Sequence, residues 1–323
     1  MILFGKHNLF RTTLISVLSI ATFILYAMFY PMTKADTIFE IQSGEYLSTV
    51  INKLHSEKII QSPILFKLWM YLTWNQNNLK IGEYKIPRGA SLNDIKDTIT
   101  NGRMYNHFVT IPEGLTVKQI AEILNNIPDI SGTITIPAND GELLPQTYAY
   151  NKSTTRDDII RKMQSAMSET IASEWAEREP NLPLKSERDA IILASIVERE
   201  TGVPEERPLV ASVFINRLNK GMRLQSDTTV VYTLTHGYGN MHGRQLFRKD
   251  LEAITPYNTY KIKGLPAGAI ANPGIESIRA VLHPAQTDYL YFVADGTGGH
   301  KFARTLEEHE HNRTNWRKIR DGK

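Results

Sequence analysis

The longest hydrophobic run of the chain lies near its N-terminus. Residues 12–30 read TTLISVLSIATFILYAMFY and carry no charge, with Lys6 and Arg11 before them and Lys34 after them. About 20 apolar residues at ~1.5 Å each span a hydrocarbon core of ~30 Å. Helices in soluble domains are seldom apolar on every side for this length, and the apolar part of a cleaved signal peptide is usually shorter. The pattern predicts a transmembrane helix over residues 12–32.

The charges around this run predict its orientation. Under the positive-inside rule, Lys6 and Arg11 keep residues 1–11 in the cytoplasm as a short tail. The chain beyond Lys34 is then exported. We therefore expect a single-pass protein that acts outside the membrane.

After this segment, the hydrophobic pattern follows one local plan three times: a short strand, a turn with Gly, and an amphipathic helix. The strands are expected at 37–41, 82–86 and 108–111, and the turns carry Gly44, Gly89 and Gly114. Preferred N-cap residues, Ser62, Ser91 and Thr116, mark the starts of helices. Units of this size predict an α+β module of about 50 to 70 residues. Such a module serves equally well as a scaffold or as a glycan-binding domain.

The second half of the chain is predicted to be mainly helical. A loop-rich stretch over 126–151 precedes a long helix at 157–177, and Ser186 caps a further helix at 187–200. Strands at 289–294 and 301–304 flank a Gly-rich turn, which predicts a hairpin. The charged residues that follow are typical of a solvated helix.

The helix predicted at 187–200 ends in two glutamates on different faces. At 3.6 residues per turn, Glu200 continues the apolar stripe of this helix, whereas Glu198 lies about 200° away from it. Partial burial and the negative end of the helix dipole both favour the protonated form of Glu200. A general acid needs this property. The residue types alone still favour a surface glutamate or one paired with Arg199 or Arg217.

Composition excludes several other chemistries. The 323 residues include 37 Lys+Arg, 34 Asp+Glu and no cysteine, and 41% are hydrophobic. Disulfides, thiolate metal sites and a cysteine nucleophile are therefore excluded. The net charge of +3 is small and dispersed, so nucleic acid is not an expected partner. The sequence contains neither His-Glu-x-x-His nor Gly-x-Ser-x-Gly, and we expect no metal and no cofactor.

Five ordered motifs occur between residues 194 and 274. They are ASIVERETGVPEERPLVASVFINRLNKGMRLQ at 194–225, SDTTV at 226–230, PYNTY at 256–260, GLPAGAI at 264–270 and NPG at 272–274. Together they closely resemble the endolytic murein transglycosylases of the YceG-like (MltG) family, and the resemblance covers essentially the whole chain. It implies an α+β protein with a LysM-like module at 37–105 and a mixed α/β catalytic domain at 106–323. The short tail resembles the Gram-negative form, which implies anchoring in the inner membrane and a periplasmic catalytic domain.

The resemblance also implies an activity and a site. The family cleaves nascent peptidoglycan strands internally, between N-acetylmuramic acid and N-acetylglucosamine, and leaves 1,6-anhydro-muramic acid ends. Its catalytic glutamate falls on Glu200, the residue that the helical-face argument also selects. One carboxylate suffices because the 6-hydroxyl of the muramic acid replaces water as the attacking group. Polar and aromatic candidates for substrate binding are Asn216, Arg217, Gln225, Asp227, Tyr257, Asn258 and Tyr260, although turn formation or capping explains each of them about as well.

Two positions depart from the family pattern, and two other functions remain open. Thr228 stands where relatives commonly carry Pro; we expect it in a turn or at a strand start, with little effect on the chemistry. Gln146 replaces an Asp, so no role of that Asp can be transferred. The alternatives are a non-catalytic peptidoglycan-binding scaffold and a hydrolase in which Glu198 or Asp227 positions water. Expected partners are glycan strands and peptidoglycan synthases, the penicillin-binding proteins.

Overall fold

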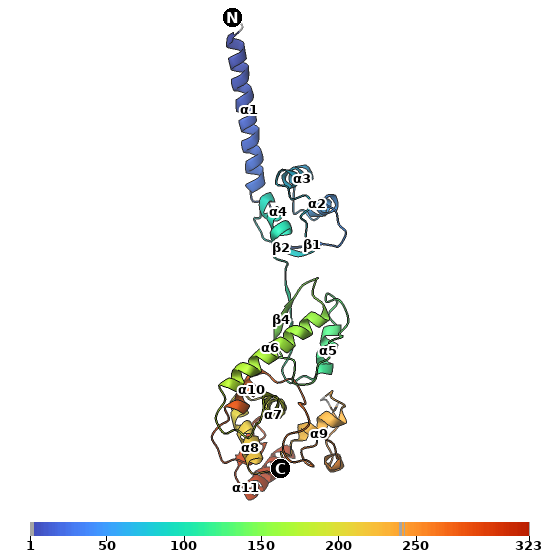
Figure 1. Ribbon diagram of the computed structural model, residues 1–323, viewed down its shortest axis with the longest axis vertical. Coiled ribbons are helices and arrows are strands. Elements are labelled where there is room, and N and C mark those ends of the chain that lie inside the picture. Colours follow the sequence, from blue (N-terminus) through green and yellow to red (C-terminus); the bar gives the residue numbers. More distant parts are fainter. Residues whose placement is uncertain (1–2, 239–240, 242, 323) are drawn as a thin grey trace. The chain divides into compact units, whose positions relative to one another are not determined.

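The computed structural model describes residues 3–238, 241 and 243–322, which form two compact units. Unit 1 comprises residues 1–107 and 149–153, and unit 2 comprises residues 108–148 and 154–323. The chain passes between the units inside two paired strands, β3 (His107–Thr110) and β4 (Thr147–Tyr150). Figure 1 labels the elements in chain order. Small two-stranded sheets and many helices make this an α+β protein, as the sequence predicts.

Unit 1 begins with the long apolar helix α1 (Leu3–Phe29). Within it, the segment Arg11–Phe29 has a mean hydropathy of 2.0 and is long enough to cross a membrane. Only 6% of its most apolar 18 residues are buried. The helix therefore fits single-pass anchoring. The helix is longer at its N-terminal end than predicted, since it includes residues 3–11 of the predicted tail. Met1 and Ile2 lie outside the described residues.

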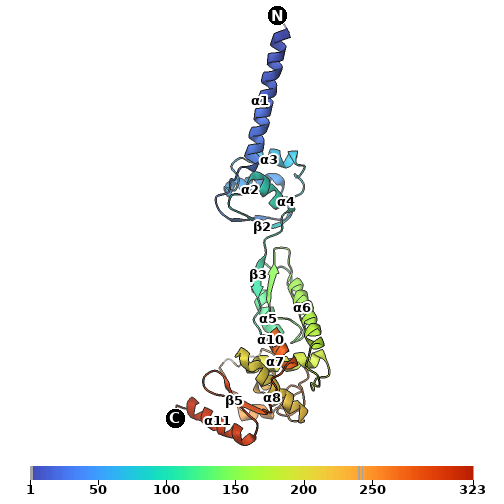
Figure 2. The same ribbon diagram turned by 90° about the vertical axis from the view of Figure 1, so that its left-hand side faces the viewer.

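The rest of unit 1 is a small sheet covered by helices (Figure 2). Strands β1 (Thr37–Ile41) and β2 (Gly82–Ile86) pair antiparallel, with Phe39 opposite Tyr84. The helices are α2 (Leu47–Ser56), α3 (Pro63–Leu72) and α4 (Leu92–Asn101). Apolar side chains from all of these elements are buried together, and Met28 of α1 is part of the same core. The end of α1 is thus packed into the module that follows it.

The predicted local plan is confirmed in all three places. β1 leads into α2, β2 into α4, and β3 into α5 (Val117–Asn125). Gly44, Gly89 and Gly114 have φ angles of +84°, +81° and +74°, which glycine adopts at little cost. Ser91 and Thr116 each form a capping box. The turns and caps explain why these short segments fold as the pattern predicts.

Unit 2 is built around a buried helix. Its remaining elements are α6 (Arg156–Ala176), α7 (Glu187–Glu200), α8 (Arg207–Asn219), α9 (Asp227–Leu234), α10 (Ile275–Leu282), β5 (Tyr291–Ala294), β6 (His300–Ala303), α11 (Leu306–Arg320) and the 3-10 turns η1 (Pro204–Glu206) and η2 (Arg248–Glu252). Helix α7 contacts α6, α8, α9 and α10. Its residues 192–197 are all buried. The predicted hairpin is confirmed as β5 and β6, which pair antiparallel.

Candidate active site

Glu200 is the last residue of α7, the buried helix of unit 2. Ser186 caps the start of α7 by accepting a hydrogen bond from the backbone N–H of Asp189, as predicted. Thr201 has φ −136° and ψ 133°, so the helix stops directly after Glu200. Because packing on several sides fixes the helix, the position from which the Glu200 side chain extends is also fixed.

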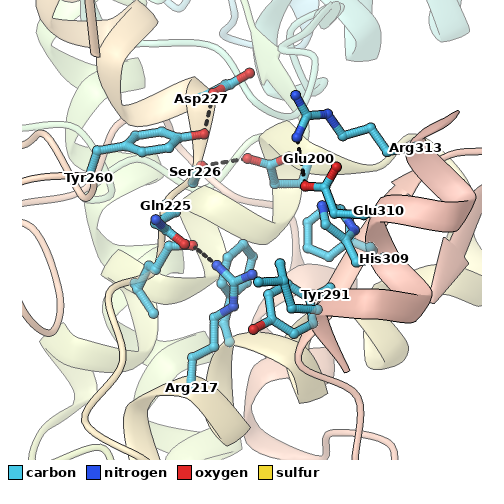
Figure 3. Close-up of a pocket in the computed structure, with 14 residues that line it drawn as sticks. Glu200, Arg217, Gln225, Ser226, Asp227, Tyr260, Tyr291, His309, Glu310 and Arg313 are labelled. Carbon is cyan, nitrogen blue, oxygen red and sulfur yellow. Dashed lines mark hydrogen bonds and ion pairs between the residues drawn. The ribbon is translucent and has the colours of Figure 1, made fainter. Parts of the chain in front are cut away.

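Two hydroxyl groups bind the carboxylate of Glu200, and Figure 3 shows the bond from Ser226. Ser226 Oγ donates to Glu200 Oε1 at 2.5 Å, and Thr228 Oγ1 donates to the same oxygen at 3.2 Å. Ser226 is the N-cap residue of α9, but its side chain makes no capping bond, so its hydroxyl is available to Glu200. The expected turn or strand at Thr228 is wrong, because this residue lies in the first turn of α9. A proline here would remove one donor from Glu200.

The loop that presents Ser226 is held by a buried polar network. The backbone N–H of Ser226 donates to Thr259 Oγ1 at 2.9 Å, and Thr229 Oγ1 donates to Ser226 O at 2.7 Å. The hydroxyls of Thr229 and Thr259 are 2.9 Å apart, and both residues are fully buried. Gln225, next to Ser226, has a left-handed φ of +51°, a costly conformation for a residue with a side chain. The Ser226 hydroxyl is therefore preorganised against Glu200.

The surroundings of Glu200 favour its protonated form. Burial raises the pKa of Glu200, and the negative charge of nearby Asp227 raises it further. The hydrogen bonds from Ser226 and Thr228 act in the opposite direction, because they stabilise the carboxylate. The net pKa lies above the ordinary value of a glutamate, which suits a group that must first donate a proton and later accept one.

Glu200 lies in the wall of a pocket of about 390 Å³. Among the predicted site residues, the structure brings Glu200, Arg217, Gln225, Asp227 and Tyr260 together around it. Figure 3 shows Asp227 and Tyr260 on one side of Glu200 and Arg217 below it. The Tyr260 hydroxyl donates to Asp227 Oδ1 at 2.6 Å, and burial together with this bond raises the pKa of Tyr260.

Arg217 supplies a buried positive charge to the pocket. Its side chain donates to the backbone carbonyls of Leu290 and Leu224, both at 2.6 Å, and only 7% of the residue is exposed. The guanidinium lies over the ring of Tyr291, 5.2 Å from its centre. Within the described part of the chain, no carboxylate forms an ion pair with Arg217. The pocket is thus suited to a ligand that carries an anionic or strongly accepting group.

Three predicted site residues do not line this pocket. Asn216 donates to two backbone carbonyls before β5, at 2.8 and 3.0 Å. Asn258 is 1% exposed and donates to the carbonyls of Leu251, in η2, and Ala253, just after it, at 3.0 and 2.6 Å. Tyr257 has its ring 5.0 Å from that of Tyr232, in a different pocket of about 440 Å³. The first two side chains organise loops, and the third belongs to another surface.

Helix α11 contributes residues to the pocket that the sequence analysis assigned to a solvated helix. His309, Glu310 and Arg313 line the pocket, and Glu310 and Arg313 form an ion pair at 2.8 Å. His309 stacks on Tyr291 with ring centres 5.2 Å apart. Its buried Nδ1 has no hydrogen-bond partner among the described residues, and burial lowers the pKa of the ring. The packing of α11 against β5 brings these residues to the pocket, and the sequence does not indicate that packing.

Glu198 lies outside the pocket, on a different face of α7 from Glu200, as predicted. Its Oε2 accepts a hydrogen bond from the backbone N–H of Gly274 at 3.1 Å, and its Oε1 lies 3.6 Å from Arg207. Glu198 therefore holds the NPG motif. Among the described residues, no group of three His, Asp or Glu side chains could share a metal ion.

Comparisons with known proteins agree on one family. The sequence model of the YceG-like family matches residues 39–315. An endolytic murein transglycosylase from Bacillus subtilis (strain 168) is 31% identical over 309 residues, covering 86% of this chain and 84% of that protein. One from Streptococcus pneumoniae serotype 2 is 27% identical over 316 residues, covering 84% of this chain but only 57% of that protein. A crystal structure of a yceG-like protein from Listeria monocytogenes is 31% identical, with a TM-score of 0.52, covering 86% of this chain and 99% of that one.

Proposed function

This chain belongs to the YceG-like family, and we propose that it cuts peptidoglycan with Glu200 as the single catalytic acid and base. Its activity is that of a murein transglycosylase, a lyase acting on peptidoglycan, like its Bacillus subtilis relative. One observation carries the assignment of Glu200: a carboxylate with a raised pKa, bound by two hydroxyls, lies in the wall of a pocket of about 390 Å³. Pockets of about 300 to 1,000 Å³ are typical of small-ligand sites.

The proposed reaction needs no water. Protonated Glu200 donates its proton to the oxygen that leaves with N-acetylglucosamine, and the bond from this oxygen to C1 of N-acetylmuramic acid breaks. The 6-hydroxyl oxygen of the same muramic acid forms a bond to C1 and gives its proton to the Glu200 carboxylate. The acid is thereby restored, and the new end is a 1,6-anhydro-muramic acid.

The hydroxyl groups that donate to Glu200 have a role in the second half of this reaction. Between the two proton transfers Glu200 is an anion, and the donors Ser226 and Thr228 stabilise it without having to reorganise. Asp227 and Glu310 also line the pocket, but Tyr260 and Arg313 already bind them. A hydrolase usually needs a second carboxylate to activate water. This arrangement favours the single-carboxylate reaction.

We assign substrate contacts to the side chains that line the pocket. Arg217 would face the lactyl or peptide carbonyl groups of the muramic acid, because its cation has no ion-pair partner within the described residues. Gln225, Asp227 and Tyr260 would bind hydroxyl and N-acetyl groups. To these we add His309, which lines the pocket and was not among the residues predicted from the sequence.

The charges around α1 support one orientation. Lys6 and Arg11 precede the apolar segment, which favours a cytoplasmic N-terminus and an active site outside the membrane. Anchoring in the inner membrane and a periplasmic active site are what the resemblance to the Gram-negative form of the family implies. In this arrangement residues 37–105 form a LysM-like module that binds glycan, and residues 106–323 carry out the reaction. The enzyme would then act beside the penicillin-binding proteins that make its substrate.

Mass spectrometry of uncrosslinked glycan strands tests the reaction. The full-length chain in detergent is compared with Glu200→Gln and with Glu198→Gln, a matched change two residues earlier on α7. We expect anhydro-ended fragments from the wild type and from Glu198→Gln, and none from Glu200→Gln. Fragments heavier by one water would identify a hydrolase. Unchanged cleavage by Glu200→Gln would refute the assigned role of this residue.

A further inference from the structure

Helix α3 of unit 1 is apolar on both of its faces. Phe66 and Met70 are fully buried in the core of the unit. On the outer face, Ile64, Leu68, Tyr71 and Leu72 are 80%, 42%, 52% and 57% exposed. Surface helices normally present polar side chains to water, so a contiguous exposed apolar face indicates that another apolar phase covers it.

Trp74 extends this outer face just after the helix. Its side chain is 82% exposed. Its backbone has a φ of +56°, a left-handed conformation that is unfavourable for a bulky residue. The left-handed backbone ends α3, with the N–H of Asn75 donating to Met70 O at 2.9 Å, but it does not require so large and exposed a side chain. Tryptophan is the residue type most typical of the boundary between lipid and water.

The position of α3 relative to α1 identifies the apolar phase. Phe29, the last residue of α1, contacts Trp69 of α3 edge to face, with ring centres 6.1 Å apart. Met28 lies in the same core as Phe66, so α1 and α3 are packed within one unit. Both views show α3 beside the C-terminal end of α1 (Figures 1 and 2). If α1 crosses the membrane, α3 lies where it leaves the lipid.

The charges of this segment are complementary to a bacterial membrane surface. Residues 58–82 contain Lys58, Lys67 and Lys80 but no Asp or Glu. Lys67 is exposed on α3 itself. Basic residues next to an apolar surface attract anionic lipid headgroups, whereas acidic residues would be repelled.

We propose that the outer face of α3, together with Trp74, is a second membrane contact that embeds in the interface of the bilayer from which α1 emerges. The occupant is the lipid surface rather than a protein partner. Two contacts, one spanning and one interfacial, would fix the orientation of unit 1 on the membrane. This function is independent of Glu200 and of glycan cleavage.

Site-directed fluorescence on the full-length chain tests the proposal. Because the sequence has no cysteine, single variants Ile64→Cys and Trp74→Cys can each carry one environment-sensitive dye. Ser43→Cys is the control in the same unit, because Ser43 is exposed and lies outside α3, in the polar turn between β1 and α2. Leu18→Cys in α1 reports whether the anchor has inserted. The proteins are reconstituted in vesicles of phosphatidylethanolamine and phosphatidylglycerol, with brominated lipids or aqueous acrylamide as quenchers.

We expect dyes at positions 64 and 74 to be quenched by brominated lipid and protected from acrylamide, like the dye at position 18. The dye at position 43 should respond only to acrylamide. Replacing phosphatidylglycerol with phosphatidylcholine should reduce lipid quenching at 64 and 74, and unchanged quenching would refute the role given to the lysines. If dyes at 64 and 74 behave like that at 43 while position 18 is inserted, α3 faces water and the proposal is wrong.

Discussion

Replacing Ser226 by alanine is the sharpest test of how the protein tunes Glu200. The substitution removes the closer of the two donors to Glu200 Oε1, at 2.5 Å, and leaves Thr228 at 3.2 Å. It costs α9 little, because the Ser226 side chain makes no capping hydrogen bond there. The variant therefore changes the proton affinity of Glu200 more than it changes the fold.

The expected size of the effect follows from the energy of a charge-assisted hydrogen bond. Such a bond contributes about 1.5–3 kcal/mol, and about 1.4 kcal/mol corresponds to one pKa unit. Thr228 still donates to the same oxygen and water can enter the vacated space, so the lower end applies. Because the lost bond stabilised the anion, the pKa of Glu200 should rise, by about one unit.

The assay is the pH dependence of kcat/KM for glycan strand cleavage. The proposed first step needs protonated Glu200, so kcat/KM should fall as pH rises through the pKa of this residue. In Ser226→Ala this alkaline limb should move to higher pH. Ser212→Ala is the matched control, because Ser212 is 2% exposed, makes hydrogen bonds of its own and does not line the pocket. A limb that stays in place, or moves to lower pH, would refute the tuning argument.

Three further predictions concern charge and stability. Asp227→Asn should move the alkaline limb to lower pH, opposite to Ser226→Ala, because it removes a negative charge that raises the pKa of Glu200; a pH–rate profile measures this. At a pH above the raised pKa of Glu200, Glu200→Gln should melt at a higher temperature than the wild type, because the folded wild type then holds a buried anion. The difference in melting temperature should vanish as the pH falls towards 4.5, the ordinary pKa of the residue in the unfolded chain. Melting curves across pH test this, and an equal difference at low pH would contradict it. Asn272→Ala should lower the free energy of unfolding by about 2–5 kcal/mol, because this buried amide accepts from the backbone N–H groups of Gly141 and Leu143 and donates to Leu115 O. Urea unfolding measures the change. The control is Asn219→Ala at an exposed position, whose free energy of unfolding should stay within about 0.5 kcal/mol of the wild type.

Local structure could be predicted from the sequence because its causes are local. Gly44 and Gly89 permit their turns, and the capping box of Thr116 starts its helix, whatever the rest of the chain does. Strand pairing was not predictable in the same way. The first two strands of the repeated plan pair with each other, whereas the third pairs with β4. Nothing in the repeated pattern distinguishes β3 from the strands before it.

The site shows the same division between local and distant causes. Glu200 could be selected because a helical period and a helix end are local features. Arg217 and Asp227 followed from motifs close to it in sequence. His309 could not, since only the packing of α11 against the β5 strand brings it over Tyr291. Asn216 and Asn258 are of a residue type that often binds sugars, but their side-chain amides already donate to backbone carbonyls of neighbouring segments.

The two glutamates of α7 show why a single helix end can serve both the fold and the reaction. Glu198 accepts from Gly274 and pairs with Arg207, so its charge is compensated by a cation and a backbone donor. Among the described residues, Glu200 accepts hydrogen bonds only from hydroxyl groups, which carry no full charge, and its pKa stays raised although the more distant His300 lowers it. An arginine in place of Ser226 would hold Glu200 ionised and remove the acid that the proposed first step requires. The use of neutral donors at Glu200 and a cation at Glu198 therefore distinguishes the proposed catalytic carboxylate from a structural one two residues away.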